Sequence, residues 1–492
     1  MEPPSRVPPL RVASANRAGV NPAGAYVLYW MIANRRAGWN WALERAVEWA
    51  RHLARPLVVL EALRADYRWA CDRLHAFVLQ GMADNAAAFA GHAVTYVPYV
   101  EPTPGAGKGL LEVLGGQACL VVTDDAPVFF LPRMVAAAAR ALPVRLECVD
   151  AYGLLPLRAT DAVFPSAYAF RRLLQRLLPA EVGDMPLADP LAGPPLPGPA
   201  TLPQVVAARW PAASPELLAG RPGALAALPI GHDVAPVATV PGGPVTGAKV
   251  LQRFLRERLP RYAAARNHPD EEATSGLSPY LHFGHVGAHQ VFAALAAHEG
   301  WTPARLAERA HGKKAGWWGM SENAEAFLDE LVTWREVGGN FAAKRDDGER
   351  WESLPPWARA TLEAHAADRR DHLYDLPTFA AAATHDPLWN AAQRQLLREG
   401  TIHSYLRMLW GKNILAWTPA PQEALEVMFE LNNRLALDGR DPNSASGIMW
   451  CLGRYDRPWG PERPVFGTIR FMSSAATRRK LRLARYLERF GS

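Results

Sequence analysis

The sequence predicts two domains of different class: an N-terminal α/β domain built on a doubly wound parallel sheet, and an all-helical C-terminal domain. Three observations support this prediction. The 492 residues exceed what one compact core accommodates. Between residues 26 and 149, short apolar runs alternate with amphipathic helical stretches, which is the pattern of a parallel sheet covered on both faces. Beyond residue 248, almost every segment has helical periodicity.

The elements of the α/β domain follow in order from these runs. The first strand is expected at residues 26–31 (YVLYWM), and a helix follows it over residues 41–50. We expect the other strands at 56–60, 93–99, 118–123 and 144–149, and the other helices at 69–90, 110–114 and 131–142.

Shifts in composition mark the domain boundaries. Residues 1–20 are rich in Pro and Arg and are expected to form a flexible arm. Residues 181–247 are rich in Pro, Gly and Ala, which disfavours long helices and sheet ladders, so we expect an interdomain linker with short helices there. The α/β domain is therefore predicted at 21–180 and the helical domain at 248–492.

Overall composition narrows the class of protein. The chain is 49% hydrophobic and 21% charged, which excludes wholesale disorder. The net charge of +6 is compatible with a polyanionic partner but does not decide for one. The four cysteines are widely spaced and no stretch approaches 18 apolar residues, so we expect no metal centre and no membrane span. Because no signal-peptide pattern begins the sequence, we expect a cytoplasmic protein. We also expect the protein to act as a monomer.

Tryptophan is the unusual residue of this chain. Eleven of the 17 tryptophans lie between Trp301 and Trp459. Indole rings supply stacking surfaces and electron carriers, or simply fill a helical core. Trp410 and Trp417 are seven residues apart, which places them on one face of a helix, about 10.5 Å apart along its axis. This spacing permits electron transfer between the rings, although two tryptophans in one stripe are more often only core.

Further segments carry candidate chemistry. The run Thr274-Ser-Gly-Leu-Ser278 places hydroxyl groups before a helix, which suits either a phosphate cradle or an ordinary helix cap. Glu330 and Trp334 share a helix face, where an acid and an indole could bind a heteroaromatic base, or where Glu330 could simply face solvent. The charged loop 437–443 favours a functional role. The segment 104–109 (PGAGKG), in contrast, lacks the early glycine and the hydroxyl of a phosphate-binding loop.

These segments, in this order, resemble the class II cyclobutane pyrimidine dimer photolyases of the photolyase/cryptochrome superfamily. The similarity spans about residues 25–475. It is carried by the first strand and helix, by the Thr274–Ser278 run, and by C-terminal motifs: THDPLWNAA (384–392), REG (398–400), LRM (406–408), LDGRDPN (437–443), GIMW (447–450) and ERPVFGTIRFM (462–472).

The resemblance implies light-driven DNA repair. In this family the helical domain binds FAD, and an electron passes from the light-excited, reduced cofactor to a pyrimidine dimer flipped out of UV-damaged DNA, whose cyclobutane ring then splits. The family also allows a second, antenna chromophore of deazaflavin or folate type in the α/β domain. The sequence leaves the presence and identity of that chromophore open.

The resemblance also assigns roles to individual residues. Asn432 would lie near flavin N5, Arg407 and Asp438 would form a salt bridge beside the flavin, and Glu330 would bond the dimer base. With Met408, these form the implied catalytic set. The implied FAD contacts are Tyr262, Thr274, Ser275, Gly276, Leu277, Ser278, Arg407, Asn432, Asp438 and Asp441. The implied substrate contacts are Glu330, Trp334, Met408 and Trp450, and the implied electron relay runs through Trp410, Trp389 and Trp417 to Tyr374.

Two other functions stay open at this point. A cryptochrome would keep flavin and relay but act on a partner protein, and the retained dimer-contacting residues count against it. A dark flavin oxidoreductase would need a nicotinamide site, and no GxGxxG follows any predicted strand. The chain departs from the family pattern outside the implied catalytic set, at Ala33-Asn34, Trp39, Gly276, Leu409 and Tyr455–Arg457.

Overall fold

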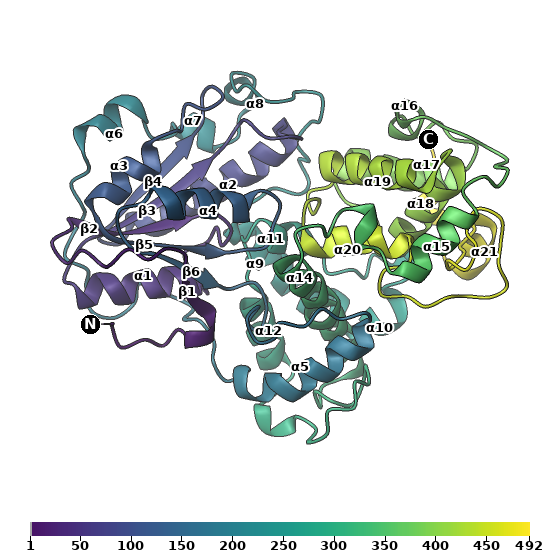
Figure 1. Cartoon of the computed structure of the whole chain (residues 1–492), viewed down its shortest axis with the longest axis horizontal. Coiled ribbons are helices and arrows are strands. Elements are labelled where there is room, and N and C mark those ends of the chain that lie inside the picture. The colour runs from purple at the N-terminus through teal and green to yellow at the C-terminus, as the bar shows by residue number, and fades with distance from the viewer. Residues whose placement is uncertain (1) are drawn as a thin grey trace. The chain divides into compact units, whose positions relative to one another are not determined.

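The computed structural model describes residues 2–492, which divide into two compact units (Figure 1). The two units interleave along the sequence. Helix α5 (Ala167–Glu181) crosses from one unit to the other, and residues 277–297, which the sequence places in the helical domain, belong to the first unit. The first unit comprises the chain up to Thr160, Leu178–Leu251 and Leu277–Ala297, and the second comprises Asp161–Leu177, Gln252–Gly276 and His298–Ser492.

A six-stranded sheet forms the centre of the first unit, in the order β1-β6-β5-β2-β3-β4. Neighbouring strands are parallel, except that β1 is antiparallel to β6. The chain order reverses at β2, so the predicted doubly wound sheet is confirmed. The strands are β1 (Val12–Ser14), β2 (Tyr26–Met31), β3 (Leu57–Leu63), β4 (Val94–Val100), β5 (Ala118–Asp125) and β6 (Leu146–Asp150).

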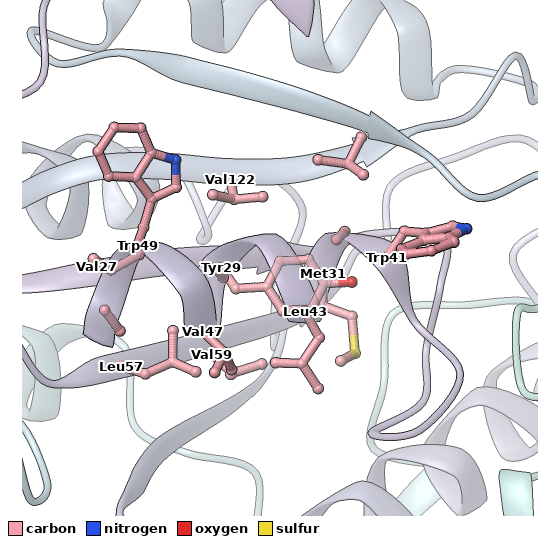
Figure 2. Close-up of a cluster of buried hydrophobic side chains, with 14 of the residues drawn as sticks. Val27, Tyr29, Met31, Trp41, Leu43, Val47, Trp49, Leu57, Val59 and Val122 are labelled. Carbon is pink, nitrogen blue, oxygen red and sulfur yellow. The ribbon is translucent and has the colours of Figure 1, made fainter. Parts of the chain in front are cut away.

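Helices cover both faces of this sheet, and alternate residues of β2 point to opposite layers. Val27, Tyr29 and Met31 pack with Trp41 and Trp49 of α1 in the cluster drawn in Figure 2. The intervening residues of β2 pack in a separate cluster with side chains of α3 and α6. The helices with most residues in this unit are α1 (Trp41–His52), α2 (Asp72–Ala90), α3 (Leu110–Gln117), α4 (Leu131–Ala141), α6 (Gln204–Arg209), α7 (Pro215–Leu218), α8 (Pro222–Leu225), α9 (Pro244–Arg253), α11 (Ser278–His282) and α12 (Ala288–His298).

A buried carboxylate closes the edge of the sheet where β2 and β5 end. Asp124 accepts hydrogen bonds from the backbone N–H groups of Ile32, Ala33 and Asn34 at 2.7–2.9 Å, and also from the Tyr29 hydroxyl at 2.8 Å. Three converging N–H groups form an anion-binding nest, and here the protein's own carboxylate fills it. The departure from the family pattern at Ala33-Asn34 therefore lies in a loop with fully satisfied hydrogen bonds to Asp124.

Part of the segment predicted as a flexible arm belongs to the fold. Val12–Ser14 pair with β6, and the buried Arg11 guanidinium donates to the carbonyls of Asp150, Gly153 and Leu154 at 2.7–3.3 Å. The Pro and Arg content of this segment gives no sign of an edge strand. The contacts that bury Arg11 come from residues 150–154, which are distant in the sequence. The prediction of a flexible arm is therefore wrong for this part of the segment.

The Pro-rich stretch 181–247 contains short helices, as expected, and it also packs against the first unit. Trp210 is buried in the same cluster as the β2 residues that face α3, and its ring N–H donates to the Ala106 carbonyl at 2.8 Å. Leu218, Leu225 and Leu228 pack against α2. Trp210, the tryptophan that stands alone in the sequence, thus fixes the stretch 181–247 to the first unit.

The second unit is helical, because no strand lies beyond β6 in the described part of the chain. A π-helix, Asp329–Trp334, interrupts the run between α13 and α14. No helix among residues 2–492 is both long enough and apolar enough to cross a membrane. The helices of this unit are α5 (Ala167–Glu181), α10 (Tyr262–Ala265), α13 (Glu322–Leu328), α14 (Arg335–Lys344), α15 (Pro356–Ala364), α16 (Leu376–Ala380), α17 (Pro387–Glu399), α18 (Ser404–Trp417), α19 (Pro421–Leu435), α20 (Pro442–Cys451), α21 (Ser474–Lys480) and α22 (Ala484–Phe490).

Candidate active site

Helix α20 is the element that brings the predicted site residues together. It packs against α14, α18 and α19. Two glycines allow the close approach: a Cβ at Gly338 would lie 2.9 Å from the Pro442 carbonyl oxygen, and one at Gly411 would lie 2.5 Å from Cys451 Sγ. Met408, on α18, accepts a weak hydrogen bond at its carbonyl from Cys451 Sγ at 4.0 Å, and its own side chain is half-buried.

Two predicted substrate residues face each other across this packing. The rings of Trp334 and Trp450 lie 5.4 Å apart, centroid to centroid, at an interplanar angle of 34°. Both side chains are half-buried, whereas an ordinary core pair would be fully enclosed. Two partly exposed indoles offer apolar faces against which a planar ligand can pack.

Glu330 and Trp334 both lie in the π-helix Asp329–Trp334, whose wider turn changes the α-helical spacing assumed from the sequence. The half-exposed carboxylate of Glu330 forms an ion pair with Arg266, whose guanidinium also lies over the Tyr262 ring, 5.5 Å from the centroid. Burial lowers the pKa of Arg266, but the neighbouring Glu330 carboxylate more than offsets this, and the net pKa is raised. Burial, reinforced by Glu330, raises the pKa of Tyr262. Arg266 thus joins a predicted cofactor residue to a predicted catalytic one.

A second polar group lies where α18, α19 and α20 meet. Arg407 donates to Asp438 at 2.8 Å, which confirms that these two residues form an ion pair. The buried Asn432 amide donates to Ser444 Oγ at 2.9 Å and to Asn433 Oδ1 at 3.1 Å. Asp441 caps α20 by accepting from the Asn443 N–H at 2.8 Å.

This polar group leaves hydrogen-bonding capacity unused. Arg407 Nε and Asn433 Nδ2 are buried and have no hydrogen-bond partner among residues 2–492. Buried donors of this kind are costly unless something accepts from them. They fit a ligand that carries several carbonyl and ring-nitrogen acceptors, such as the isoalloxazine of FAD.

The predicted relay residues form a continuous series of rings. Trp389, from α17, lies parallel to Trp410 at 6.4 Å and lies 6.0 Å from Trp417, so it bridges the two rings of α18. Tyr374 packs edge-on against Trp417 at 5.9 Å. The two inner rings are fully buried, at 2% exposure for Trp410 and 0% for Trp389, whereas Trp417 is 8% exposed and Tyr374 is half-buried. The order inferred from the resemblance is therefore the order of ring contacts.

The candidate phosphate cradle is less enclosed. Thr274 and Ser275 are half-buried, and Gly276 has φ +73°, a left-handed conformation that glycine adopts without steric cost. Arg258 donates to the Thr274 carbonyl at 3.0 Å. Leu277 precedes the short helix α11, which begins at Ser278 and belongs to the first unit. No side-chain cap bonds the first turn of α11 among the described residues.

The C-terminal segment clasps the residues that lead into this cradle. Arg482 pairs with Glu271 at 2.6 Å, and Arg489 pairs with Glu272 at 3.0 Å. Asp270 accepts from the backbone N–H groups of Arg485 and Tyr486, at 3.2 and 2.8 Å, and so caps the first turn of α22 from a distance. We call residues 482–489 the C-terminal clasp; it was not predicted.

Sequence reasoning also missed an aromatic and cationic surface in the loop after α20. Arg457 and Arg470 both lie over the Trp459 ring, at 4.5 and 5.1 Å from its centroid, and Arg463 lies over Phe471 at 4.8 Å. The three arginines are exposed. The only sequence signal was the combination of Arg and aromatic residues between 457 and 471, which spacing alone does not distinguish from an ordinary loop.

Comparisons with known proteins bear on the identity of this site. The deoxyribodipyrimidine photo-lyase of Methanothermobacter thermautotrophicus is 33% identical over 485 residues, which are 97% of this chain and 97% of that protein. Proteins of the same name from Potorous tridactylus and Oryza sativa subsp. japonica are each 32% identical, covering 93% and 97% of this chain and 80% and 89% of their own lengths. No protein-family model matches the chain.

The fold is that of the photolyases. The crystal structure of a bacterial class III photolyase from Agrobacterium tumefaciens superposes with a TM-score of 0.66 at 17% identity, over 95% of this chain and 86% of that one. Given the extent and identity of the full-length similarities, the chain belongs to the deoxyribodipyrimidine photo-lyase family.

A buried lysine beside α20 gives a test of this packing. Lys412 donates from Nζ to the Cys451 carbonyl at 2.6 Å, and burial lowers its pKa from 10.5 to about 8. Between pH 8 and 10.5 the unfolded chain binds the extra proton, so the stability of the native protein rises with pH in this window. Relative to Lys412→Met, the parent should gain roughly 3 kcal/mol of unfolding free energy from pH 8 to 10.5.

Denaturant unfolding of both proteins at several pH values measures this difference. Lys249→Met, which removes an exposed lysine of α9, serves as the control, because its difference from the parent should stay flat. A difference between parent and Lys412→Met that does not depend on pH would mean that the ammonium group is not enclosed by α20.

Proposed function

We propose that this chain is a class II photolyase that uses light to repair cyclobutane pyrimidine dimers in DNA. The observation that carries the proposal is the facing pair Trp334 and Trp450, half-buried at 5.4 Å, next to the carboxylate of Glu330. A dimer flipped out of the duplex presents two non-planar pyrimidines with exposed carbonyl and N–H groups, which require apolar walls and a hydrogen-bonding acid. Met408, on the neighbouring helix, would complete the wall.

The proposed cofactor is FAD. Reduced FAD, when bound, supplies the electron that light transfers to the dimer. Asn432, Arg407, Asp438 and Asp441 would hold the flavin ring, and the unpartnered donors of Arg407 and Asn433 support this assignment. Tyr262 and the run Thr274, Ser275, Gly276, Leu277 and Ser278 would hold the remainder of the cofactor through hydroxyl and backbone N–H groups.

Within this proposal, each remaining site residue has a positional task. Glu330 accepts from a dimer base N–H, and the Arg266 ion pair holds its carboxylate in place until the dimer arrives. Trp410, Trp389 and Trp417 carry electrons inward from Tyr374 to reduce an oxidised cofactor. Their buried, closely spaced rings support that direction.

The arginine and tryptophan surface after α20 would contact DNA. Arg457, Arg463 and Arg470 are exposed cations that can pair with phosphates, and Trp459 offers a ring on which an unpaired base can stack. We further propose that the protein is cytoplasmic and acts as a monomer. Sedimentation of the purified protein tests the monomeric state.

A second chromophore would bind in the first unit at an aromatic cluster formed by the loops after β3 and β5. Phe129 and Phe130 pack at 4.9 Å, Trp69 lies 5.7 Å from Phe129, and Tyr67 lies 5.7 Å from Phe130. Arg68 lies over the Trp69 ring at 4.6 Å. Ligands of doubly wound sheets bind at this edge, near the reversal of strand order. A planar, anionic deazaflavin or folate suits these rings and cations.

Repair and photoreduction should separate cleanly in two variants. Glu330→Gln should reduce dimers repaired per absorbed photon severalfold, because the neutral amide accepts a weaker hydrogen bond, while photoreduction of FAD persists. Trp389→Phe should do the reverse: it blocks photoreduction, because a phenyl ring is much harder to oxidise, yet repair returns after chemical reduction. Both are measured on dimer-containing oligonucleotides under steady illumination. A parent protein that binds FAD but leaves dimers untouched in the reduced state would refute the proposed function and favour a cryptochrome.

DNA binding should depend on the surface after α20. We expect Trp459→Ala to weaken binding to a dimer-containing duplex roughly tenfold, since stacking on one aromatic ring contributes about 1–3 kcal/mol. Arg457→Gln and Arg470→Gln should each lower the slope of log affinity against log salt concentration by about 1. Arg253→Gln, in α9, is the matched control. Salt slopes that are equal in all four proteins would place the DNA elsewhere.

The absorption spectrum of the purified protein tests the second chromophore. We expect a band in addition to those of flavin, and Trp69→Ala should lose this band while the flavin bands remain, because the variant removes one of the proposed stacking rings. A parent spectrum with flavin bands only would refute this part of the proposal and leave the repair site unaffected.

A further inference from the structure

The outer end of the ring series contains a hydrogen bond that the relay alone does not require. The Tyr374 hydroxyl lies 2.8 Å from Nδ1 of His385, and the backbone N–H of His385 donates to the same phenol oxygen at 3.0 Å. His385 also packs against Trp417, with ring centroids 4.8 Å apart. One histidine therefore contacts both the last tryptophan and the tyrosine that follows it.

The donor and acceptor pattern fixes where the phenol proton lies. A phenol has one proton to donate, and its oxygen already accepts from the His385 N–H. We assign the O–H proton to a hydrogen bond toward Nδ1, which then carries a lone pair, and this corresponds to the neutral imidazole protonated at Nε2. His385 lies at the surface, and the partial burial of its ring, with a smaller contribution from the neighbouring His372, lowers its pKa, which favours the neutral ring at pH 7.

The position of His385 is fixed from both sides. Thr384 is tied to Asn390, which accepts from its N–H at 3.0 Å and from its hydroxyl at 2.7 Å. Asp386 caps α17 by accepting from the Leu388 and Trp389 N–H groups at 2.8 and 3.0 Å. The same helix start that places Trp389 in the relay therefore also places the imidazole beside Tyr374.

The proton matters because an oxidised phenol is a strong acid. Tyrosine gives up an electron at moderate potential only when its proton leaves in the same event, whereas an indole can be oxidised and remain protonated. A tyrosine next to Trp417 without a base would be a poor electron donor. A neutral imidazole at 2.8 Å removes this limitation.

We propose that His385 is the base that receives the phenol proton when Tyr374 donates an electron to oxidised Trp417. The step balances as written: one electron moves from Tyr374 to the Trp417 radical cation, the phenol O–H bond breaks, and an N–H bond forms at His385 Nδ1. The products are neutral Trp417, a neutral tyrosyl radical and an imidazolium. This inference rests on the proposed function in so far as the relay oxidises Trp417.

The surroundings of His385 determine its pH dependence. His372 stacks on the His385 ring, with centroids 3.7 Å apart, and the rings of Tyr374 and Trp417 also pack against it. The Asp386 carboxylate follows it directly in the sequence. His372 opposes protonation of His385 and Asp386 favours it, and burial together with His372 outweighs Asp386. His385 can therefore accept a proton at neutral pH. It loses this capacity as the pH falls through its pKa, which lies below the usual value for histidine.

Flash photolysis of the full chain loaded with oxidised FAD tests the step. In the parent, the tryptophan radical should decay as a tyrosyl radical appears, with a solvent deuterium isotope effect and a rate that falls at acidic pH. His385→Gln keeps a hydrogen-bond acceptor but is not a base, so the tyrosyl radical should form at least about tenfold more slowly, without the acidic decline, and added imidazole should restore part of the rate. His372→Gln, which alters the stacked neighbour only, should retain the parent behaviour at neutral pH.

Two outcomes would overturn the inference, and they are distinguishable. If a normal tryptophan radical is followed by the tyrosyl radical at the parent rate and pH profile in His385→Gln, only the role of His385 fails. If no tryptophan radical forms in the parent, the proposed relay fails and the role of His385 fails with it. Nitrogen NMR of histidine-labelled protein gives a readout that needs no light: at pH 7, His385 Nδ1 should carry no proton, and a protonated Nδ1 would contradict the proposal.

Discussion

The close approach of helix α20 to its neighbours is the constraint on which the candidate site depends. Two positions without a side chain, Gly338 and Gly411, allow this one short helix to contact α14 and α18 at the same time. Trp450 consequently reaches Trp334, and Ser444 reaches Asn432. Any side chain at either glycine would push α20 outward and separate groups that come from four distant parts of the sequence. The site is therefore a property of helix packing, and no single motif contains it.

Two buried polar groups of the protein differ in how completely their hydrogen bonds are satisfied. In the first unit, the Asp124 carboxylate receives five hydrogen bonds from its neighbours, so the loop after β2 is complete by itself. In the second unit, donors of Arg407 and Asn433 stay unpartnered within the described residues. A protein accepts such a cost where a ligand will supply the missing acceptors.

Sequence reasoning succeeded where chemistry is local. The alternation of apolar runs located five strands, and β1 was missed because its three residues gain their order from β6, which lies more than 130 residues away. The spacing of Trp410 and Trp417 indicated one helix face, but Trp389 and its parallel stacking come from another helix. Arg266 was missed because nothing near it in the sequence marks it, and the surface formed by Arg457, Arg463 and Arg470 was missed because the motifs that contain them do not show that they pack on aromatic rings. The identity of the cofactor and substrate came from family resemblance, since no residue pattern alone distinguishes a flavin from another heteroaromatic ligand.

The C-terminal clasp also bears on the order in which the protein matures. Residues 482–489 hold Asp270, Glu271 and Glu272, directly ahead of the candidate cradle, yet they leave the ribosome more than 200 residues later. Until then Glu271 and Glu272 lack their ion pairs with Arg482 and Arg489, although Arg261 can already pair with Glu271. A chain that ends before residue 482 would therefore retain its sheet and most of its helices while lacking these contacts to the residues ahead of the candidate cradle.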